Sequence, residues 1–381
     1  MGQEILYDEL IFSPNDVDLS FSPLRNGIDV KTFVLGAFNP GLCRLPNGNL
    51  MIMVRVAEAL MNPIAGDNVH CIRWDSIQKK YKTDPWPLSQ VKMDDPRKFT
   101  IKAYNFPVIA LTSLSWLLPV ELNENGSIVK KVHYDKIIAP QFSSQEYGIE
   151  DPRISLIEGK YYMTTCCVSS ERHSTVLYES IDGLNYTFKG IVLDHQNKDM
   201  LLFEGKIQNK YYALTRPMGE CYFATPPDSL YHPGAAIHLA SSENMTHWKP
   251  DDAPFLRARR SSLSNVKIGG GTAPILTPDG WLILYHGVEN KTAVGVYRTF
   301  WALLDKNDPS KILFLEDTFP LLEANPKITA SINRQIYLTD VVFTTGMIAH
   351  QNEYILASGE LDLACRITRI SKDYFLNSIH K

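Results

Sequence analysis

One pattern recurs five times along the chain and constrains its fold more than any other feature. An apolar stretch leads into a two-residue turn that ends in Gly or Asn, and a run of aromatic and branched residues follows. Gly and Asn tolerate the positive φ that tight hairpin turns require, so each unit predicts a β-hairpin. The turns fall at residues 47–48, 158–159, 208–209, 279–280 and 351–352.

Repeated hairpins of this kind predict an all-β chain folded as a β-propeller, and five hairpins predict five blades. The turn residues at positions 48, 159, 209, 280 and 352 lie 111, 50, 71 and 72 residues apart. Three of these spacings suit one four-stranded blade each, and the first is too long. We assign the excess to residues 84–115, a proline-rich and charged stretch that predicts a surface insertion. A β-sandwich or a solenoid is the alternative.

The chain therefore divides into three parts. Residues 1–30 are expected to form an N-terminal arm with short strands, and residues 31–370 the propeller with its active site at the central channel. Residues 371–381 form a tail, in which residues 373–379 could make a short helix. Outer strands are expected at residues 174–180, 186–192 and 236–240.

Composition excludes several classes of protein. With 44% hydrophobic and 21% charged residues, the chain is not disordered. A net charge of -4 gives no electrostatic footprint for nucleic acid, and the basic cluster Arg257, Arg259 and Arg260 is interpreted as a solvated loop. The absence of a long apolar window predicts no membrane partner. We expect a cytoplasmic protein, or a periplasmic one if a signal peptide was removed.

The six cysteines lie in or beside apolar runs and show neither a C-x-x-C motif nor zinc-site spacing. We interpret them as reduced core residues and expect no metal and no cofactor.

The first strand of each propeller blade lines the central channel, so the residues just before each hairpin should converge there. These are residues 38–41, 150–153, 203–206, 269–272 and 343–346. Two of the sets carry carboxylates, one adds a lysine, and the glycines of the fourth would let a ligand approach the backbone.

Paired carboxylates around a polar cleft fit glycoside chemistry, in which one acid protonates the departing oxygen and a second group activates the nucleophile. Asp151 is the candidate acid. The plainer alternative is that Glu150 or Asp151 only pairs with Arg153 and braces the channel.

Several strings in this order resemble glycoside hydrolase family 130, which contains β-mannoside phosphorylases and β-1,2-mannosidases. They are residues 38–40 (FNP), 148–154 (GIEDPRI), 203–207 (FEGKI), 216–217 (RP), 280–288 (GWLILYHGV), 303–305 (LLD), 308–311 (DPSK) and 359–362 (GELD). The resemblance covers roughly residues 30–370 and implies a five-bladed propeller, which the hairpins predict independently.

The resemblance also implies roles for individual residues. Asp151 would be the general acid of a reaction that inverts the anomeric carbon of a β-mannoside, reaching the glycosidic oxygen through a sugar hydroxyl. Substrate-binding positions would be Asn39, Arg55, Glu150, Arg153, Lys206, Arg216, Tyr285, His286 and Asp362. The plainer alternatives are that Arg55 and Arg153 are strand-end salt-bridge partners and that Asp362 is a turn residue.

The two activities of the family differ in whether phosphate or water attacks. Phosphorylases of the family hold phosphate with a lysine, two arginines and a histidine, as a doubly charged nucleophile requires. Lys206 matches the lysine, but Ser169, Ser170, Phe188 and Lys189 stand where the arginines are expected, and Thr215 replaces the histidine. Arg172 could supply one arginine if the alignment is shifted.

Glu204 lies next to the expected phosphate position, where a carboxylate would repel phosphate and could activate water. We therefore favour an inverting, exo-acting β-1,2-mannosidase with Glu204 as the base and Glu220 or Glu289 in reserve. Glu204 could instead only neutralise Lys206.

The first alternative is a β-mannoside phosphorylase that uses inorganic phosphate to give α-mannose 1-phosphate, with Arg172, Lys206 and Arg216 converging on the anion. A carbohydrate-binding propeller without turnover and an arabinanase-like glycosidase with three channel carboxylates rank lower. The β-1,2 or β-1,4 linkage is set by loops, and residues 84–115 are the expected wall of the outer subsite. A homo-oligomer fits this picture, since a site walled by loops often borrows residues from a neighbouring copy.

Overall fold

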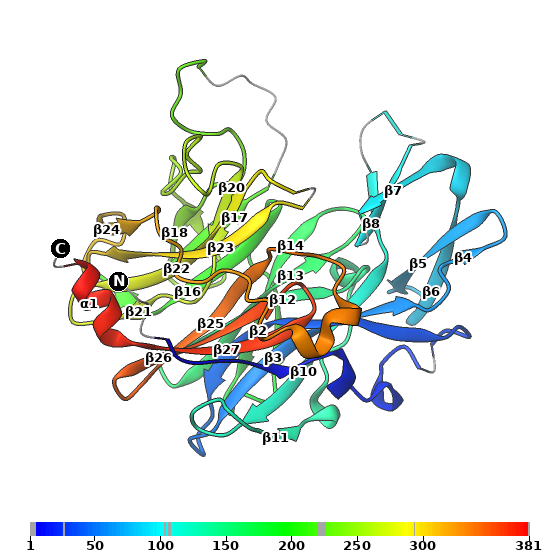
Figure 1. Ribbon diagram of the computed structural model, residues 1–381, viewed down its shortest axis with the longest axis horizontal. Coiled ribbons are helices and arrows are strands. Elements are labelled where there is room, and N and C mark those ends of the chain that lie inside the picture. Colours follow the sequence, from blue (N-terminus) through cyan, green and yellow to red (C-terminus); the bar gives the residue numbers. More distant parts are fainter. Residues whose placement is uncertain are drawn as a thin grey trace.

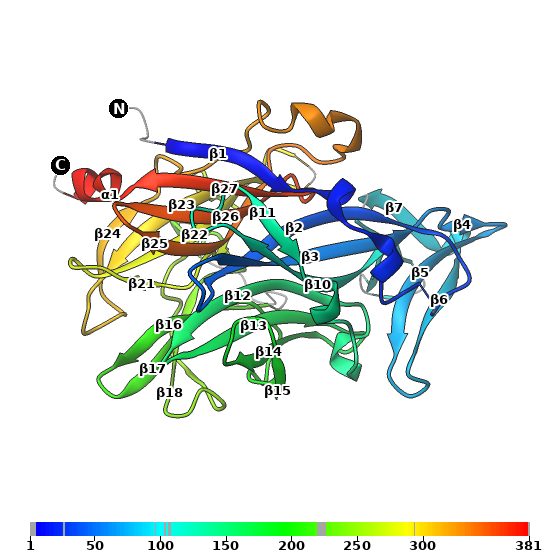
Figure 2. The ribbon, with the colours of Figure 1, turned by 90° about the horizontal axis from the view of Figure 1, so that it is seen from below.

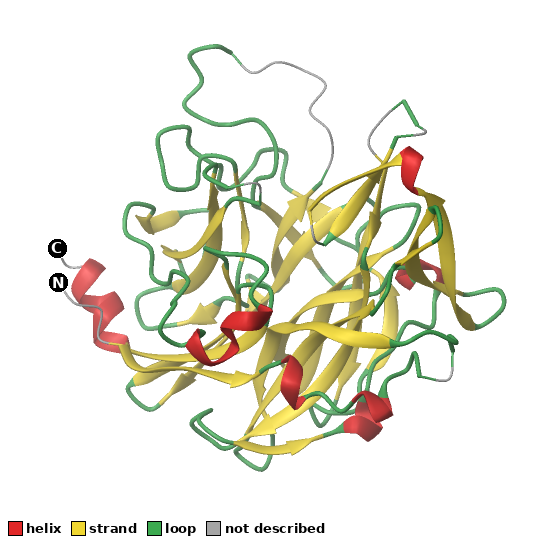
Figure 3. Cartoon of the chain, turned by 45° about the vertical axis from the view of Figure 1, so that its right-hand side comes forward, coloured by secondary structure: helices red, strands yellow, loops and turns green. Residues whose placement is uncertain are grey.

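The computed structural model describes residues 5–25, 27–95, 97–102, 104–105, 108–218, 226–292 and 294–379. Strands dominate the chain, and helices are short (Figure 3). The α-helix α1 covers Lys372–Ile379, and short 3-10 helices cover Pro14–Asp16, Leu19–Phe21, Leu88–Gln90, Tyr134–Lys136, Ser143–Gln145 and Ala330–Gln335. No helix among the described residues is long and apolar enough to cross a membrane.

Five antiparallel sheets form the blades (Figure 1). Blade 1 contains β2 (Thr32–Arg44), β3 (Leu50–Leu60), β10 (Ser113–Leu122) and β11 (Val129–Val132); blade 2 contains β12 (Ile149–Ile157), β13 (Lys160–Val168), β14 (His173–Ser180) and β15 (Thr187–Ile191). Blade 3 contains β16 (Asn197–Ile207), β17 (Lys210–Pro217), β18 (His238–Ser242) and β19 (Lys249–Pro250); blade 4 contains β20 (Lys267–Gly270), β21 (Ile275–Leu276), β22 (Trp281–Glu289), β23 (Val296–Leu304) and β24 (Ile312–Glu316). Blade 5 contains β25 (Val342–His350), β26 (Glu353–Glu360), β27 (Ala364–Ser371) and β1 (Ile5–Phe12).

The five expected hairpin turns all join neighbouring strands of a blade, which confirms the five-bladed propeller. Five buried hydrophobic clusters close the ring, because each one joins two adjacent blades. Successive side chains of β16 point to opposite faces of its sheet, so this strand packs against both adjacent blades. Leu201 and Phe203 pack toward blade 4, whereas Met200 and Leu202 pack toward blade 2.

The N-terminal segment is part of the ring. β1 pairs antiparallel with β27 at the outer edge of blade 5, so the two ends of the chain share one blade (Figure 2). Asp8 in β1 forms an ion pair with Arg366 in β27, 2.7 Å apart, and Arg366 also contacts Glu360 at 2.9 Å. This buried network fastens the first strand to the last blade.

The expected insertion is larger and more ordered than a loop. It leaves blade 1 after β3 and returns at β10, so it begins well before residue 84. It folds into two three-stranded sheets on one side of the ring (Figure 1). Their strands are β4 (Ile64–Ala65), β5 (Asn68–Asp75), β6 (Lys80–Pro87), β7 (Val91–Asp95), β8 (Lys98–Ile101) and β9 (Val108–Leu111).

Candidate active site

A break in register within the inner strand holds a polar side chain in each of three blades. The pairing shifts between Phe38 and Gly41 in β2, between Glu150 and Arg153 in β12, and between Lys198 and Leu201 in β16. Each break holds one residue with positive φ: Asn39 at 47°, Asp151 at 50° and Asp199 at 56°. Asn and Asp tolerate this conformation better than other side chains, which explains their presence at these bulges.

These bulges border a central cavity of about 270 Å³. Among the described residues that line it, six are lysines or arginines and three are carboxylates, which gives a local charge of +3 with neutral histidines. The whole chain carries -4, so the cavity is a positive site in an acidic protein. The charged lining residues are Arg55, Arg97, Lys98, Lys198, Arg216, Lys267, Glu150, Asp151 and Asp362.

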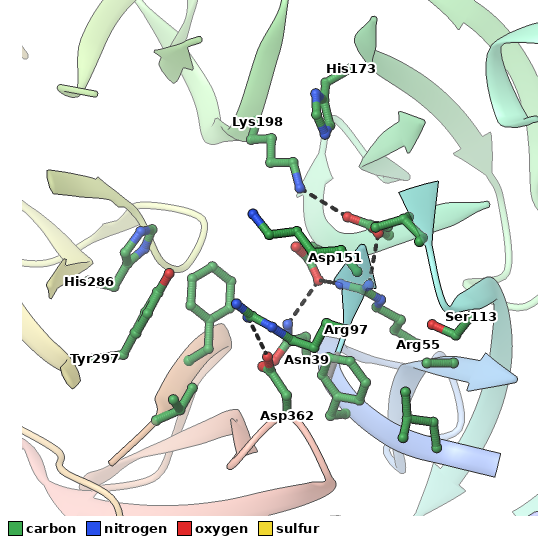
Figure 4. Close-up of a pocket in the computed structure, with 18 of the residues that line it drawn as sticks. Asn39, Arg55, Arg97, Ser113, Asp151, His173, Lys198, His286, Tyr297 and Asp362 are labelled. Atoms are coloured by element: carbon green, nitrogen blue, oxygen red, sulfur yellow. Dashed lines mark hydrogen bonds and ion pairs between the residues drawn. The ribbon is translucent and has the colours of Figure 1, made fainter. Parts of the chain in front are cut away.

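Asp151 lies at the centre of a charged cluster at the base of the cavity (Figure 4). Its Oδ1 accepts hydrogen bonds from Asn39 Nδ2 and Arg55 Nη1, both 2.9 Å away. Arg55 Nη2 reaches Glu150 Oε1 at 2.8 Å, and Lys198 Nζ contacts Glu150 Oε2 at 3.0 Å. Two adjacent carboxylates therefore share two cations.

The cluster keeps Asp151 ionised when no ligand is bound. Burial alone would raise the pKa of Asp151, but Arg55, Arg153 and Lys198, together with the hydrogen bond from Asn39, hold it well below its usual range. The pKa of Glu150 is also lowered, because Arg55 and Lys198 outweigh the effect of burial. An acid in this state must gain a proton before it can give one to a leaving group.

Arg153 braces the site from behind. Its Nη1 donates to the backbone oxygen of Asp151 at 2.7 Å and its Nε to that of Gly271 at 3.1 Å, while Nη2 contacts Asp199 Oδ1 at 3.2 Å. It is almost completely buried and does not line the cavity. This agrees with the plainer interpretation of Arg153, because its contacts hold Asp151 and Asp199 rather than open space.

One wall of the cavity carries cations and histidines from blades 2, 3 and 4. Lys198 and Arg216 come from blade 3, Lys267 and His286 from blade 4, and His173 from blade 2. Arg216 is fixed by an ion pair between its Nε and Asp199 Oδ2, 2.6 Å apart. Burial lowers the pKa of His173 to about 4 and that of His286 to about 3, so both rings are neutral near pH 7. The Nδ1 atom of His286 is buried without a hydrogen-bond partner among the described residues.

The glycines of residues 269–271 serve protein packing rather than the approach of a ligand. A Cβ on Gly269 would lie 2.4 Å from the His286 ring and 2.7 Å from Asp199 Oδ2, and one on Gly270 would lie 2.5 Å from Leu201. The missing side chains therefore let His286 and the bulge of β16 come together.

The insertion walls the other side of the cavity. Ile109 and Leu111 of β9 line it, and Arg97 Nη1 reaches across to Asp362 Oδ2 at 3.2 Å. Asp362 lies on the turn after β26 with φ 51°, and Tyr337 Oη donates to its backbone oxygen at 2.9 Å. Burial raises the pKa of Asp362, and Arg97 and Arg55 oppose this shift.

The structure brings together Asn39, Arg55, Glu150, Asp151, Arg216, His286 and Asp362 of the predicted residues. It does not place Glu204 and Lys206 in the cavity. These two residues lie near the opposite end of β16 from Lys198, roughly 20–25 Å away by the rise of a strand. Lys206 is exposed and pairs with Glu158 at 3.2 Å. Glu204 is an exposed residue and lies outside the cavity lining.

The reserve base Glu289 does not line the cavity either. Glu289 lies at the end of β22, where it pairs with Arg298 at 2.7 Å and Lys291 at 2.9 Å, and Glu220 lies outside the described residues. Tyr285 is buried against Phe300 and donates from its hydroxyl to the Glu316 backbone oxygen at 3.0 Å.

The proposed alignment shift for Arg172 does not bring that residue into the site. Its Nη1 donates to the backbone oxygen of Asp194, 2.6 Å away, and it does not line the cavity.

The main residues that sequence reasoning missed are Lys198 and Asp199, together with Arg97, His173, Lys267 and Tyr297. A signal for the first two was present. Asn39 and Asp151 stand nine and eight residues before Gly48 and Gly159, and a similar step back from the turn at Asn209 leads to Asp199 rather than to residues 203–206.

Comparison with known proteins agrees with this fold and site. The profile of glycoside hydrolase family 130, described as β-1,4-mannooligosaccharide phosphorylase, matches residues 112–381. A β-1,2-mannobiose phosphorylase of Listeria innocua is 32% identical over 339 residues, covering 86% of this chain and 88% of that protein. A 1,2-β-oligomannan phosphorylase of Thermoanaerobacter sp. is 33% identical over 216 residues, covering 56% and 64% of the two chains. The Listeria innocua enzyme, solved in complex with β-1,2-mannobiose, superposes with a TM-score of 0.82 and 27% identity over 98% of this chain and 99% of that one.

A five-bladed propeller with a carboxylate and arginine cluster in a central polar cavity is a scaffold for glycoside cleavage. The chain belongs to glycoside hydrolase family 130, as its residues already indicated, and is an enzyme that acts on mannosides.

Proposed function

We propose that this enzyme is an inverting phosphorylase of β-1,2-linked mannosides, which transfers the terminal mannosyl unit to inorganic phosphate. The observation that carries the proposal is the charge of the cavity, where six cationic side chains face three carboxylates. Phosphate carries close to two negative charges near pH 7, and a positive wall of this kind is what its binding requires.

The anion would bind against the wall that contains Lys198, Arg216, Lys267 and His286. Lys198 and Arg216 supply fixed charge, and neutral His286 can donate or accept one hydrogen bond. The exclusion of water from such a site strengthens each of these contacts. Lys198 thus takes the role that the resemblance gave to Lys206.

Asp151 supplies the proton for the leaving group, as the resemblance implies. The mannosyl unit would rest on Asn39, Arg55 and Asp362, with the leaving sugar toward Ile109 and Leu111. Phosphate then attacks the anomeric carbon from the side opposite the leaving group. The carbon–oxygen bond of the mannoside breaks as the new bond to phosphate oxygen forms, and the β-mannoside becomes α-mannose 1-phosphate.

Hydrolysis would need a carboxylate that activates water, and the described cavity lining gives little support for one. Glu150 is held by Arg55 and Lys198, and Asp362 is held by Arg97. The mannosidase interpretation rests on Glu204 as the base and on the loss of phosphate ligands. Glu204 does not line the cavity, whereas Lys198 and Arg216 do.

The β-1,2 linkage is supported by the two relatives named above, which are both phosphorylases of β-1,2-linked mannosides. The experiment is to incubate the enzyme with β-1,2-mannobiose in the presence and absence of phosphate. Cleavage that depends on phosphate and yields mannose 1-phosphate supports the proposal. Equal cleavage in both reactions, with mannose as the only product, would restore the mannosidase.

A further inference from the structure

In the free enzyme Glu150 holds the lysine that phosphate would also contact. Lys198 Nζ lies 3.0 Å from Glu150 Oε2, and Arg55 is divided between Glu150 and Asp151 at 2.8 and 2.9 Å. Lys198 also lines the cavity wall where phosphate would bind. An anion that draws Lys198 away from Glu150 leaves two acidic side chains with one guanidinium between them.

The charged groups that face Asp151 come from every strand around it. Arg55 lies on β3, Glu150 and Arg153 on β12, and Lys198 and Asp199 on β16. A further carboxylate, that of Asp362, faces Asp151 from the turn after β26 and is itself held by Arg97. Asn39 on β2 adds a neutral donor. Three carboxylates therefore surround Asp151, and its ionised state depends on the cations that offset them.

We infer that binding of phosphate draws Lys198 from Glu150 and is thereby coupled to the uptake of one proton by the Glu150–Asp151 pair. The inference rests on the proposed phosphorylase function. It assigns Lys198 a positioning role in addition to anion binding, since it links arrival of the nucleophile to loading of the acid.

The proton balance closes over one turnover. Asp151 takes a proton from solvent when phosphate binds, and gives it to the glycosidic oxygen as that bond breaks. The phosphate oxygen forms its bond to the anomeric carbon with its electron pair. The proton that the bound phosphate carried is released to solvent as α-mannose 1-phosphate leaves as a dianion, so no net proton is consumed.

The expected effect is large enough to measure. Two negative charges placed within about 7 Å, at an effective dielectric constant of about 20, raise the proton affinity of a carboxylate by roughly three orders of magnitude. Linkage then requires that the affinity for the anion rises as the pH falls, with a slope equal to the number of protons taken up.

Sulfate is the probe, because it stays a dianion across the whole range and adds no titration of its own. Isothermal calorimetry of sulfate binding between pH 5.5 and 8, in buffers with different ionisation enthalpies, counts the protons directly. We expect a fraction of a proton to be taken up per sulfate in the wild type, and this fraction should rise toward the acidic end of the range. Asp151→Asn should lose it, and Lys198→Met should bind sulfate weakly.

The two cavity histidines are the competing proton acceptors, since their pKa values lie below 7 and an anion would raise them. Uptake that persists in Asp151→Asn but disappears in His286→Gln or His173→Gln would overturn the inference. Sulfate binding in the wild type without proton uptake would overturn it as well. Absence of both sulfate and phosphate binding would instead count against the proposed function itself.

Discussion

Lys198→Met, compared with Lys206→Met, tests the anion site with two lysines of the same strand. Lys198 lines the cavity, 3.0 Å from Glu150, whereas Lys206 is exposed at the far end of β16 and pairs with Glu158. A single hydrogen bond from a charged donor contributes about 1.5–3 kcal/mol. In Lys198→Met, Glu150 also keeps only Arg55 as its ion-pair partner, and its charge then opposes phosphate.

These two effects place the expected loss near the upper part of that range. A loss of about 2–3 kcal/mol corresponds to roughly a 30- to 150-fold fall in kcat/KM for phosphate. Lys206→Met removes an exposed ion pair and should change kcat/KM by less than about twofold. The assay is the initial rate of mannose 1-phosphate formation from β-1,2-mannobiose at varied phosphate concentration, with circular dichroism to confirm folding. Equal losses in both variants, or a loss below threefold in Lys198→Met, would refute the assignment of the anion site.

Four further variants test other contacts of the structure. Asp151→Asn should lower kcat by roughly 10²- to 10⁴-fold, the usual contribution of general acid catalysis, in the same assay; a loss below tenfold would contradict its role. Glu204→Gln should leave kcat/KM within about twofold of the wild type, and a strong loss would return a catalytic role to that carboxylate. Arg366→Met leaves Asp8 with its charge but without its guanidinium partner and should cost about 3–5 kcal/mol of unfolding free energy in urea titrations. Burial raises the pKa of Asp8, but the hydrogen bonds and charge of Arg366 lower it by more, so the folded pKa lies below the unfolded value of about 3.9. The stability that ionised Asp8 contributes is therefore present above the unfolded pKa and is lost as the pH falls through the lower folded pKa. Asp8→Asn should lose less stability than the wild type as the pH falls below about 4.

The fold was predictable because its signal is local and repeated. Turn residues such as Gly48 and Asn209 need positive φ, and this requirement marks each hairpin without any knowledge of distant contacts. Closure of the ring by β1 was not predictable in the same way. It depends on β1 pairing with β27, hundreds of residues later, and on the ion pair between Asp8 and Arg366.

The site residues were predictable where they lie next to a regular hairpin. The prediction failed where register shifts lengthen the strand. Glu150 and Asp151 immediately precede the regular part of β12, so the hairpin located them well. In β16 the register shifts twice, between Lys198 and Leu201 and again between Leu202 and Lys206. These irregularities lengthen the strand, and taking the residues just before its turn led to Glu204 instead of Asp199.

The sequence did not predict which residues of the insertion reach the cavity. Arg97 meets Asp362 from 265 positions away. The insertion lines the cavity, and its two small sheets determine which of its side chains reach it; that it walls the outer subsite stays a prediction.

The most direct test of the account follows the oxygen that ends up on the mannosyl carbon. The enzyme is incubated with β-1,2-mannobiose and unlabelled phosphate in water enriched in ¹⁸O, and the products are analysed early by mass spectrometry and ³¹P NMR. The account predicts α-mannose 1-phosphate without ¹⁸O on the anomeric carbon, together with one equivalent of mannose from the leaving group. Mannose that carries ¹⁸O from the first turnovers, with no sugar phosphate signal, would contradict it.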